Sequence, residues 1–205
     1  IMEEVKKRLI DTKASGEIKR NYPEEPDEIV QEKIEQKLEV SQPLYTIGIK
    51  DTVKCETNKS EIVRKHIAME ILLNLIIGRS SNLYKELYNE GIIYAQPSLE
   101  YEFTNIYAHI LISGQSNNPE KLYEKVRQEI EKMKTNGINE EDFNRIKKMI
   151  YGGYVKEYNE VADIARMFLA DSFKGINSFD YLEEIEGVTV EYLEQILKDV
   201  FKEEK

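Results

Sequence analysis

The stretch Gly78–Tyr94 reads GRSSNLYKELYNEGIIY and joins two segments of different periodicity. Before it, residues 60–77 become almost entirely apolar in their second half, which is typical of a core helix covered on most sides. After it, residues 92–112 alternate between apolar and polar side chains around Thr104 and Asn105, which can turn the chain. This pattern predicts an antiparallel hairpin. The stretch therefore decides how the helical part of the chain meets a sheet.

Helix signals follow the hairpin as far as the C-terminus. Asn118 and Pro119 start a helix, because asparagine is a favoured cap and proline is favoured at the first helical position. Asn139 starts the next helix, and a further amphipathic segment stops at Gly175. A last helix is expected over about residues 189–201.

The first 50 residues give weaker signals. Residues 1–12 carry apolar side chains at helical spacing, and residues 13–28 contain two prolines and read as an extended connector. Residues 29–40 fit either a helix or a strand with a charged outer face. Residues 44–50 read as a buried strand.

Composition limits the classes of function. The chain has 205 residues, 40% of them hydrophobic, which is enough for one large domain or one domain plus an arm. A net charge of −10 argues against general nucleic-acid binding. The longest apolar run, Ile71–Ile77, is interrupted by Asn74 and is far short of the roughly 20 residues that cross a bilayer, so no membrane partner is expected.

The N-terminus and the single cysteine indicate a cellular context. The first residues lack the apolar core of a signal peptide, and an isoleucine ahead of Met2 leads us to expect that the chain starts inside a longer protein or carries an added residue at its start. Cys55 cannot form an internal disulfide and fits a reducing compartment, so we expect a cytoplasmic protein.

The stretch Gly78–Tyr94 resembles a segment of the pitrilysin/insulinase-type zinc metallopeptidases and the mitochondrial-processing-peptidase-like proteins. The shared features are a small-residue start, Leu-aromatic, Glu-Leu, glycine, apolar residues and tyrosine. In that family the segment belongs to the C-terminal half, which does not bind zinc. The resemblance implies an α+β domain over residues 41–205, with helices packed on one face of an antiparallel sheet. Residues 1–40 would then hold a helix, a connector and an edge strand.

The family's zinc site is His-x-x-Glu-His on a helix, followed by a downstream glutamate. The two histidines here, His66 and His109, lie 43 positions apart and neither belongs to such a motif. Glu70 shares a helix face with His66, but two ligands are a weak zinc signal, and a packed histidine is the simpler interpretation. We therefore expect no bound metal, no catalytic residue and no peptide hydrolysis by this chain alone, with zinc in a partner half.

The resemblance also implies candidate substrate-binding residues. Catalytic members contribute an arginine and a tyrosine from this segment to the substrate. Tyr88 stands where the arginine is expected, and Tyr94 lies near the tyrosine position with a spacing about one residue short. Arg79 could supply positive charge nearby. The alternatives are that Tyr94 is an ordinary strand residue and that Arg79 is a surface residue at a helix start.

The predicted function is one wall of a peptide-enclosing chamber, opposite a half that carries His-x-x-Glu-His. That half would lie in the same chain or in a partner subunit, and the substrate would be a peptide or protein. One alternative is a catalytically silent structural or peptide-binding partner subunit of the same family. Another is a free-standing module that binds peptides through its 13 tyrosines or by strand addition at the hairpin edge.

Overall fold

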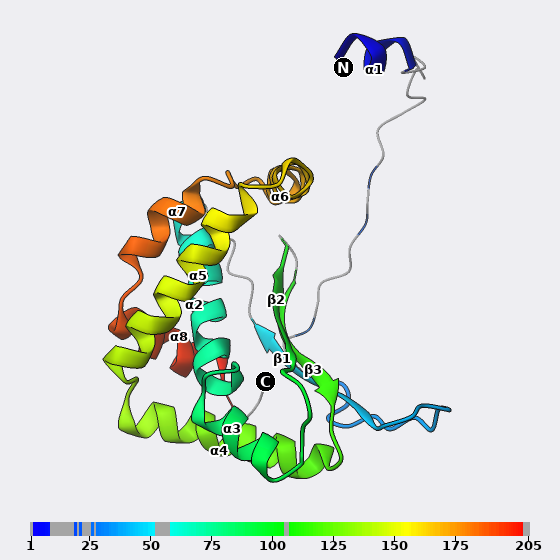
Figure 1. The fold of residues 1–205 in the computed structure, drawn as a ribbon, viewed down its shortest axis with the longest axis vertical. Coiled ribbons are helices and arrows are strands. Elements are labelled where there is room, and N and C mark those ends of the chain that lie inside the picture. The colour runs from blue at the N-terminus through cyan, green and yellow to red at the C-terminus, as the bar shows by residue number, and fades with distance from the viewer. Residues whose placement is uncertain are drawn as a thin grey trace.

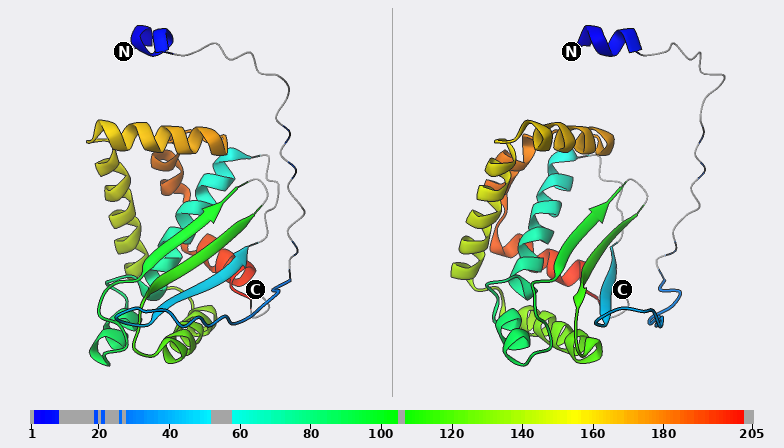
Figure 2. Two further views of the ribbon diagram at one scale, coloured as in Figure 1. Left: turned by 90° about the vertical axis from the view of Figure 1, so that its right-hand side faces the viewer. Right: turned by 45° about the vertical axis from the view of Figure 1, so that its right-hand side comes forward.

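Three antiparallel strands and a layer of helices form the body of the protein (Figure 1). The computed structural model describes residues 2–8, 19, 21, 26, 28–51, 58–104 and 107–202. The strands are β1 (Leu44–Asp51), β2 (Ser98–Phe103) and β3 (Ala108–Gln115), in the order β1-β3-β2. The helices that follow the first strand in sequence lie on one side of this sheet, whereas the N-terminal helix lies apart from it (Figure 2). The predicted α+β architecture is confirmed.

The expected helices occur in the expected order, and a short α-helix and a 3-10 helix that were not predicted precede the last one. The helices are α1 (Met2–Arg8), α2 (Lys59–Ile77), α3 (Asn82–Asn89), α4 (Pro119–Asn136), α5 (Glu140–Glu157), α6 (Val161–Lys174), α7 (Asp180–Glu184), the short 3-10 helix η1 (Ile185–Gly187) and α8 (Val190–Val200). Within the described residues, no helix is long and apolar enough to span a bilayer.

The core lies between the sheet and α2. In register, Ile47 of β1 pairs with Ile112 of β3, which in turn pairs with Leu99 of β2. Because side chains alternate across a strand, this register puts most of the apolar residues of the three strands on the face toward the helices. α2 contacts β2, α5, α7 and α8. Its buried residues, which give α2 apolar cover on most sides as predicted, are Val63, Ile67, Ala68, Met69, Ile71, Leu72, Leu73, Ile76 and Ile77.

The edge strand expected over residues 29–40 is not formed, and neither is the alternative helix. Val30 is 91% exposed, and Ile34 and Leu38 also face solvent. An alternating pattern forms a strand only when its backbone pairs with a neighbouring strand, and in the described part of the sheet β1 pairs with β3 alone. The alternating pattern is therefore not sufficient for a strand.

The first strand of the hairpin is shorter than predicted. The amides of Ile92 and Ile93 both donate to the carbonyl of Leu87, at 2.9 and 3.4 Å, and so complete the end of α3. Pro97 has no amide to give to a ladder. β2 consequently begins only at Ser98.

α1 ends at Arg8 and has no buried residue. The remainder of the helix predicted over residues 1–12 lies outside the described residues. So do most of the connector over residues 13–28 and Cys55.

Candidate functional site

The stretch Gly78–Tyr94 forms the end of α2, a tight turn, α3 and a second turn. Gly78 is required at the first turn, because a Cβ there would lie 2.7 Å from the Cα of Asn74. The Ser81 hydroxyl accepts the amide of Tyr84 at 3.0 Å and caps α3. Gly91 has φ +68°, a conformation that favours glycine. Two glycines and one cap therefore fix the path of the chain from the core helix to the sheet.

The three candidate substrate-binding residues all lie on the surface of this segment. Tyr88 is 52% exposed, Tyr94 is 50% exposed, and Arg79 is exposed in the turn between α2 and α3. The ring of Tyr88 stacks on that of Tyr84 with centroids 6.1 Å apart. Tyr94 precedes β2, so the alternative in which it is an ordinary strand residue is wrong. Its role in substrate binding stays a prediction.

Asn117 holds the phenol of Tyr94 in a defined orientation. Its side-chain amide nitrogen Nδ2 donates to the carbonyl of Gly91 at 3.2 Å and also to the hydroxyl oxygen of Tyr94. Because a backbone carbonyl can only accept, the contact with Gly91 identifies the amide atom that faces both groups as the NH₂. The oxygen of Tyr94 is therefore the acceptor in this bond, and the phenol's own hydrogen is not used in it.

The backbone of Asn117 strengthens this arrangement, since its amide donates to the carbonyl of Ile92 at 3.0 Å. Asn117 thus holds the turn after α3 through hydrogen bonds to the carbonyls of Gly91 and Ile92 and to the phenol of Tyr94. No pattern in the sequence indicates this role, because Asn117 is one of two adjacent asparagines ahead of a helix and only Asn118 has a recognisable position as its cap.

Charged residues tie α3 to its neighbours. Lys125 of α4 binds Glu86 of α3 and Glu90, the residue that follows α3, and Lys121 of α4 binds Glu90 at 3.0 Å. These lysines lower the pKa of the Glu90 carboxyl. These ion pairs connect α4 to the acidic side chains of α3 and of the residue after it.

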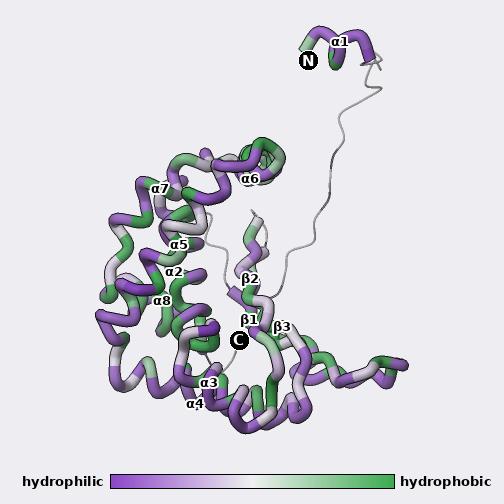
Figure 3. Tube along the Cα trace, in the orientation of Figure 1, coloured by the Kyte–Doolittle hydropathy of each residue, from purple (hydrophilic) through white to green (hydrophobic). Residues whose placement is uncertain are grey.

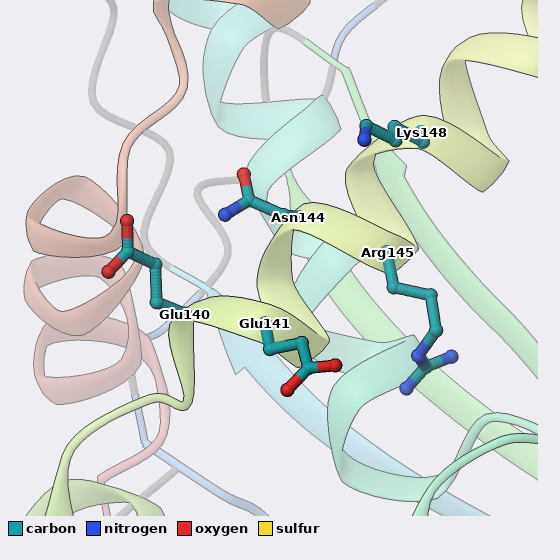
Figure 4. Close-up of a pocket in the computed structure, with 5 residues that line it drawn as sticks. All are labelled: Glu140, Glu141, Asn144, Arg145 and Lys148. Carbon is teal, nitrogen blue, oxygen red and sulfur yellow. The ribbon is translucent and has the colours of Figure 1, made fainter.

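A shallow pocket lies on the first turns of α5 (Figure 4). It is lined by Glu140, Glu141, Asn144, Arg145 and Lys148. Arg145 donates to the hydroxyl of Ser80 at 2.5 Å and pairs with Asp142 at 2.6 Å. The pocket therefore has both acidic and basic side chains on an exposed helix face. Its arginine, Arg145, already donates a hydrogen bond to Ser80 in the turn before α3.

His66 is a packed histidine. Its Nδ1 lies 2.8 Å from the hydroxyl of Tyr181 in α7, and its ring makes an edge contact with Phe103, with centroids 5.2 Å apart. Burial, with the nearby positive charge of Lys174, lowers its pKa to about 4. The imidazole is therefore neutral at pH 7.

Glu70, one turn further along α2, faces a different partner. The hydroxyl of Tyr154 in α5 donates to its carboxyl. Burial raises the pKa of this carboxyl to about 7. His66 and Glu70 thus bind two separate tyrosines, and among the described residues no three His, Cys, Asp or Glu side chains are grouped as a metal site.

His109, the second histidine, lies in β3 and stacks on Tyr107, with ring centroids 5.7 Å apart. The two histidines are therefore parts of two different aromatic clusters.

Comparison with known proteins identifies the family. The sequence pattern of the family described as "Peptidase M16 inactive domain" matches residues 2–150. A Bacillus subtilis (strain 168) protein described as the uncharacterized zinc protease YmfH is 25% identical over 185 residues, which cover 89% of this chain and 42% of that protein.

Solved structures show the same fold. An M16-like peptidase structure from Alicyclobacillus acidocaldarius matches with a TM-score of 0.86 and 24% identity, covering 99% of this chain and 48% of its own. The inactive peptidase domain of a zinc protease from Bordetella parapertussis matches with a TM-score of 0.61 and 7% identity, covering 77% of this chain and 84% of its own. The chain spans less than half the length of its Bacillus and Alicyclobacillus relatives. It belongs to the peptidase M16 family and corresponds to that family's inactive, C-terminal domain.

Proposed function

We propose that this chain forms the non-zinc wall of a peptide-enclosing chamber in a zinc peptidase of the M16 family. The zinc ion and the general base would come from a His-x-x-Glu-His half in the same polypeptide or in a partner subunit. The observation that carries this proposal is the match of residues 2–150 to the family's inactive domain. Its relatives in Bacillus and Alicyclobacillus are about twice as long, which leaves room for such a half.

Within this chamber, Tyr94 would donate a hydrogen bond to the substrate. A phenol that keeps its hydrogen can stabilise the negative charge that develops on a peptide carbonyl oxygen. Asn117 supports this role, because it binds the phenol as a donor and leaves the hydrogen of Tyr94 available. Asn117 is a positioning residue in this proposal, and Tyr94 touches the substrate.

Tyr88 and Arg79 would complete the substrate surface. Tyr88 is neutral where catalytic family members carry an arginine, so it would contribute a stacked, half-exposed ring with Tyr84 and no charge. Arg79 would supply the positive charge from the turn before α3.

A catalytically silent partner subunit is the second candidate function. The observation that favours it is Tyr88, because replacing the expected arginine removes a cation from the segment. Both candidates require a partner half, but only the first predicts turnover that depends on Tyr94.

The first test is to read the coding sequence upstream of Ile1. A His-x-x-Glu-His motif about 150–200 residues earlier, a distance set by the usual size of a domain, is the expected result. Its absence there and from neighbouring genes would refute the peptidase proposal.

The second test uses the full-length protein in a peptidase assay. Tyr94→Phe should lower kcat by roughly 100-fold or more, because removing one oxyanion donor costs on the order of 100- to 1,000-fold. Unchanged kcat would exclude Tyr94 from the reaction, whereas no turnover by the unmodified full-length protein would favour the silent subunit.

Asn117→Asp separates positioning from folding. An aspartate would accept the hydrogen of Tyr94, so kcat should fall although the size of the side chain is kept. In a Tyr94→Phe background the same substitution should cause no further loss, because the group that it orients is already gone. An equal loss in both backgrounds would mean that Asn117 acts only through the turn at Gly91.

A further inference from the structure

Helix α6 is anchored to the rest of the protein along one side. The ring of Phe168 packs edge-on against Phe179, with centroids 5.1 Å apart. Asp171 is buried and accepts the hydroxyl of Ser178 at 2.5 Å. At the end of the helix, the ammonium group of Lys174 pairs with the carboxylate of Glu102 in β2 at 3.2 Å. These contacts fix which side of α6 faces outward.

The outward side carries an apolar strip, which we define as Val161, Ala165, Leu169 and Phe173. The four residues are spaced by four and therefore lie on one face of the helix. All are exposed, Val161 and Phe173 at 82% and Leu169 at 59%. No apolar residue of α6 is buried, although much of the helix is apolar (Figure 3).

A contiguous apolar strip of this kind is typical of a surface that another protein segment covers. We infer that the apolar strip of α6 is the contact surface for the zinc-bearing half of the protein. This inference rests on the function proposed above and adds to it the place where the two halves meet.

Three observations favour the zinc-bearing half as the occupant. The Alicyclobacillus structure matches 99% of this chain, including α6, but the match covers only 48% of the Alicyclobacillus chain. The rest of that chain is therefore a further part that has no counterpart here. α6 also lies at one end of the helix layer, where a neighbouring half can reach it (Figure 2). A second copy of this chain is a poorer occupant, because each copy carries a net charge of −10 and the two would repel each other.

The test compares thiol accessibility in the 205-residue chain and in the full-length protein. Phe173→Cys is made in a Cys55→Ser background, and Tyr123→Cys is the matched control. Tyr123 is 45% exposed on α4, at the opposite end of the helix layer from α6 (Figure 1). The 205-residue chain is suited to this comparison because it has its own hydrophobic core.

Both thiols should react rapidly with a maleimide in the 205-residue chain. In the full-length protein, the reaction at position 173 should slow at least about ten-fold, as expected for a site that reacts only after local opening. The reaction at position 123 should keep its rate. An unchanged rate at position 173 in a full-length protein that holds zinc would overturn the inference. Protection in the 205-residue chain that increases with its concentration would also overturn it, because it would identify a second copy as the occupant.

A stability measurement gives an independent answer. Leu169→Glu should leave the Tm of the 205-residue chain unchanged, because the side chain is exposed there, and should lower the Tm of the full-length protein. Equal effects in both would argue against the contact. A full-length protein without His-x-x-Glu-His would instead refute the proposed function, so the two failures can be told apart.

Discussion

Replacing Glu70 should change how the stability of the chain depends on pH. The folded carboxyl has a pKa raised to about 7 by burial, whereas a glutamate in the unfolded chain titrates near 4.5. Between these values the folded state binds a proton that the unfolded state does not. The contribution of Glu70 is therefore fully present below pH 4.5 and is lost as the pH rises through 7. Glu70→Gln removes this dependence.

The structure sets the size of the effect. A difference of 2.5 pKa units corresponds to about 3 kcal/mol, because each unit is worth about 1.4 kcal/mol. Glu70 keeps some contact with solvent, so this figure is an upper limit. Relative to the unmodified protein, Glu70→Gln should become more stable by up to this amount between pH 4.5 and pH 8.

The pH dependence of stability in the unmodified protein does not isolate the effect of Glu70, because His66 contributes as well. Its folded pKa of about 4 lies below the unfolded value of 6.5, so its contribution is present above pH 6.5 and is lost as the pH falls through 4. Between pH 4.5 and 6.5 the effects of Glu70 and His66 have opposite signs and cancel. Without Glu70, the stability should rise with pH over this window.

Urea unfolding followed by circular dichroism at several pH values from 4.5 to 8 measures both proteins. Tyr154→Phe is a second arm of the experiment. The hydroxyl of Tyr154 donates to the ionised carboxyl of Glu70 and lowers the pKa of this carboxyl. Removing the hydroxyl should therefore raise the pKa of Glu70 above 7. If the difference in unfolding free energy between Glu70→Gln and the unmodified protein stays within about 0.5 kcal/mol over this range, the reasoning from burial is wrong.

Three further outcomes are expected. Leu72→Ala should cost about 2–5 kcal/mol in urea unfolding, because the side chain is fully buried in α2, whereas Leu38→Ala, on a side chain 68% exposed, should stay within about 0.5 kcal/mol. Gly137→Ala should cost about 1–3 kcal/mol in the same assay, since φ there is +79° and the added Cβ would meet a Glu194 carboxylate oxygen at 3.0 Å. Adding zinc to the 205-residue chain should leave its Tm unchanged; stoichiometric zinc in elemental analysis would contradict the assignment of the metal to another half.

Local signals in the sequence predicted the longer helices of the domain and the order of these elements, but not the short α7 and η1. Asn118 accepts the amide of Lys121 at 3.0 Å, and Asn139 accepts the amide of Asp142 at 2.9 Å, as their cap positions suggested. Caps and apolar periodicity act within one or two turns, so a single sequence contains them completely. The identity of the core helix followed from the same kind of information.

Features that depend on distant partners were missed or wrong. Residues 29–40 have a strand pattern, but no strand of the described sheet pairs with them. Asn117 reaches back to Gly91 and Tyr94 across the hairpin, a contact that no local pattern encodes. The tyrosine partners of His66 and Glu70 lie on α7 and α5, more than 80 positions away.

The residues of Gly78–Tyr94 divide into two groups with different physical reasons to be there. Leu83, Leu87 and Ile93 are buried, so packing alone accounts for them. Tyr88 and Tyr94 are half-exposed, and packing does not require a tyrosine at either place. A pattern built on the buried group identifies the fold even when catalysis has been lost, because the core selects those residues. Under the function proposed above, activity would depend on the exposed group, so Tyr94 and its partner Asn117, rather than the family match, would decide between a peptidase wall and a silent subunit.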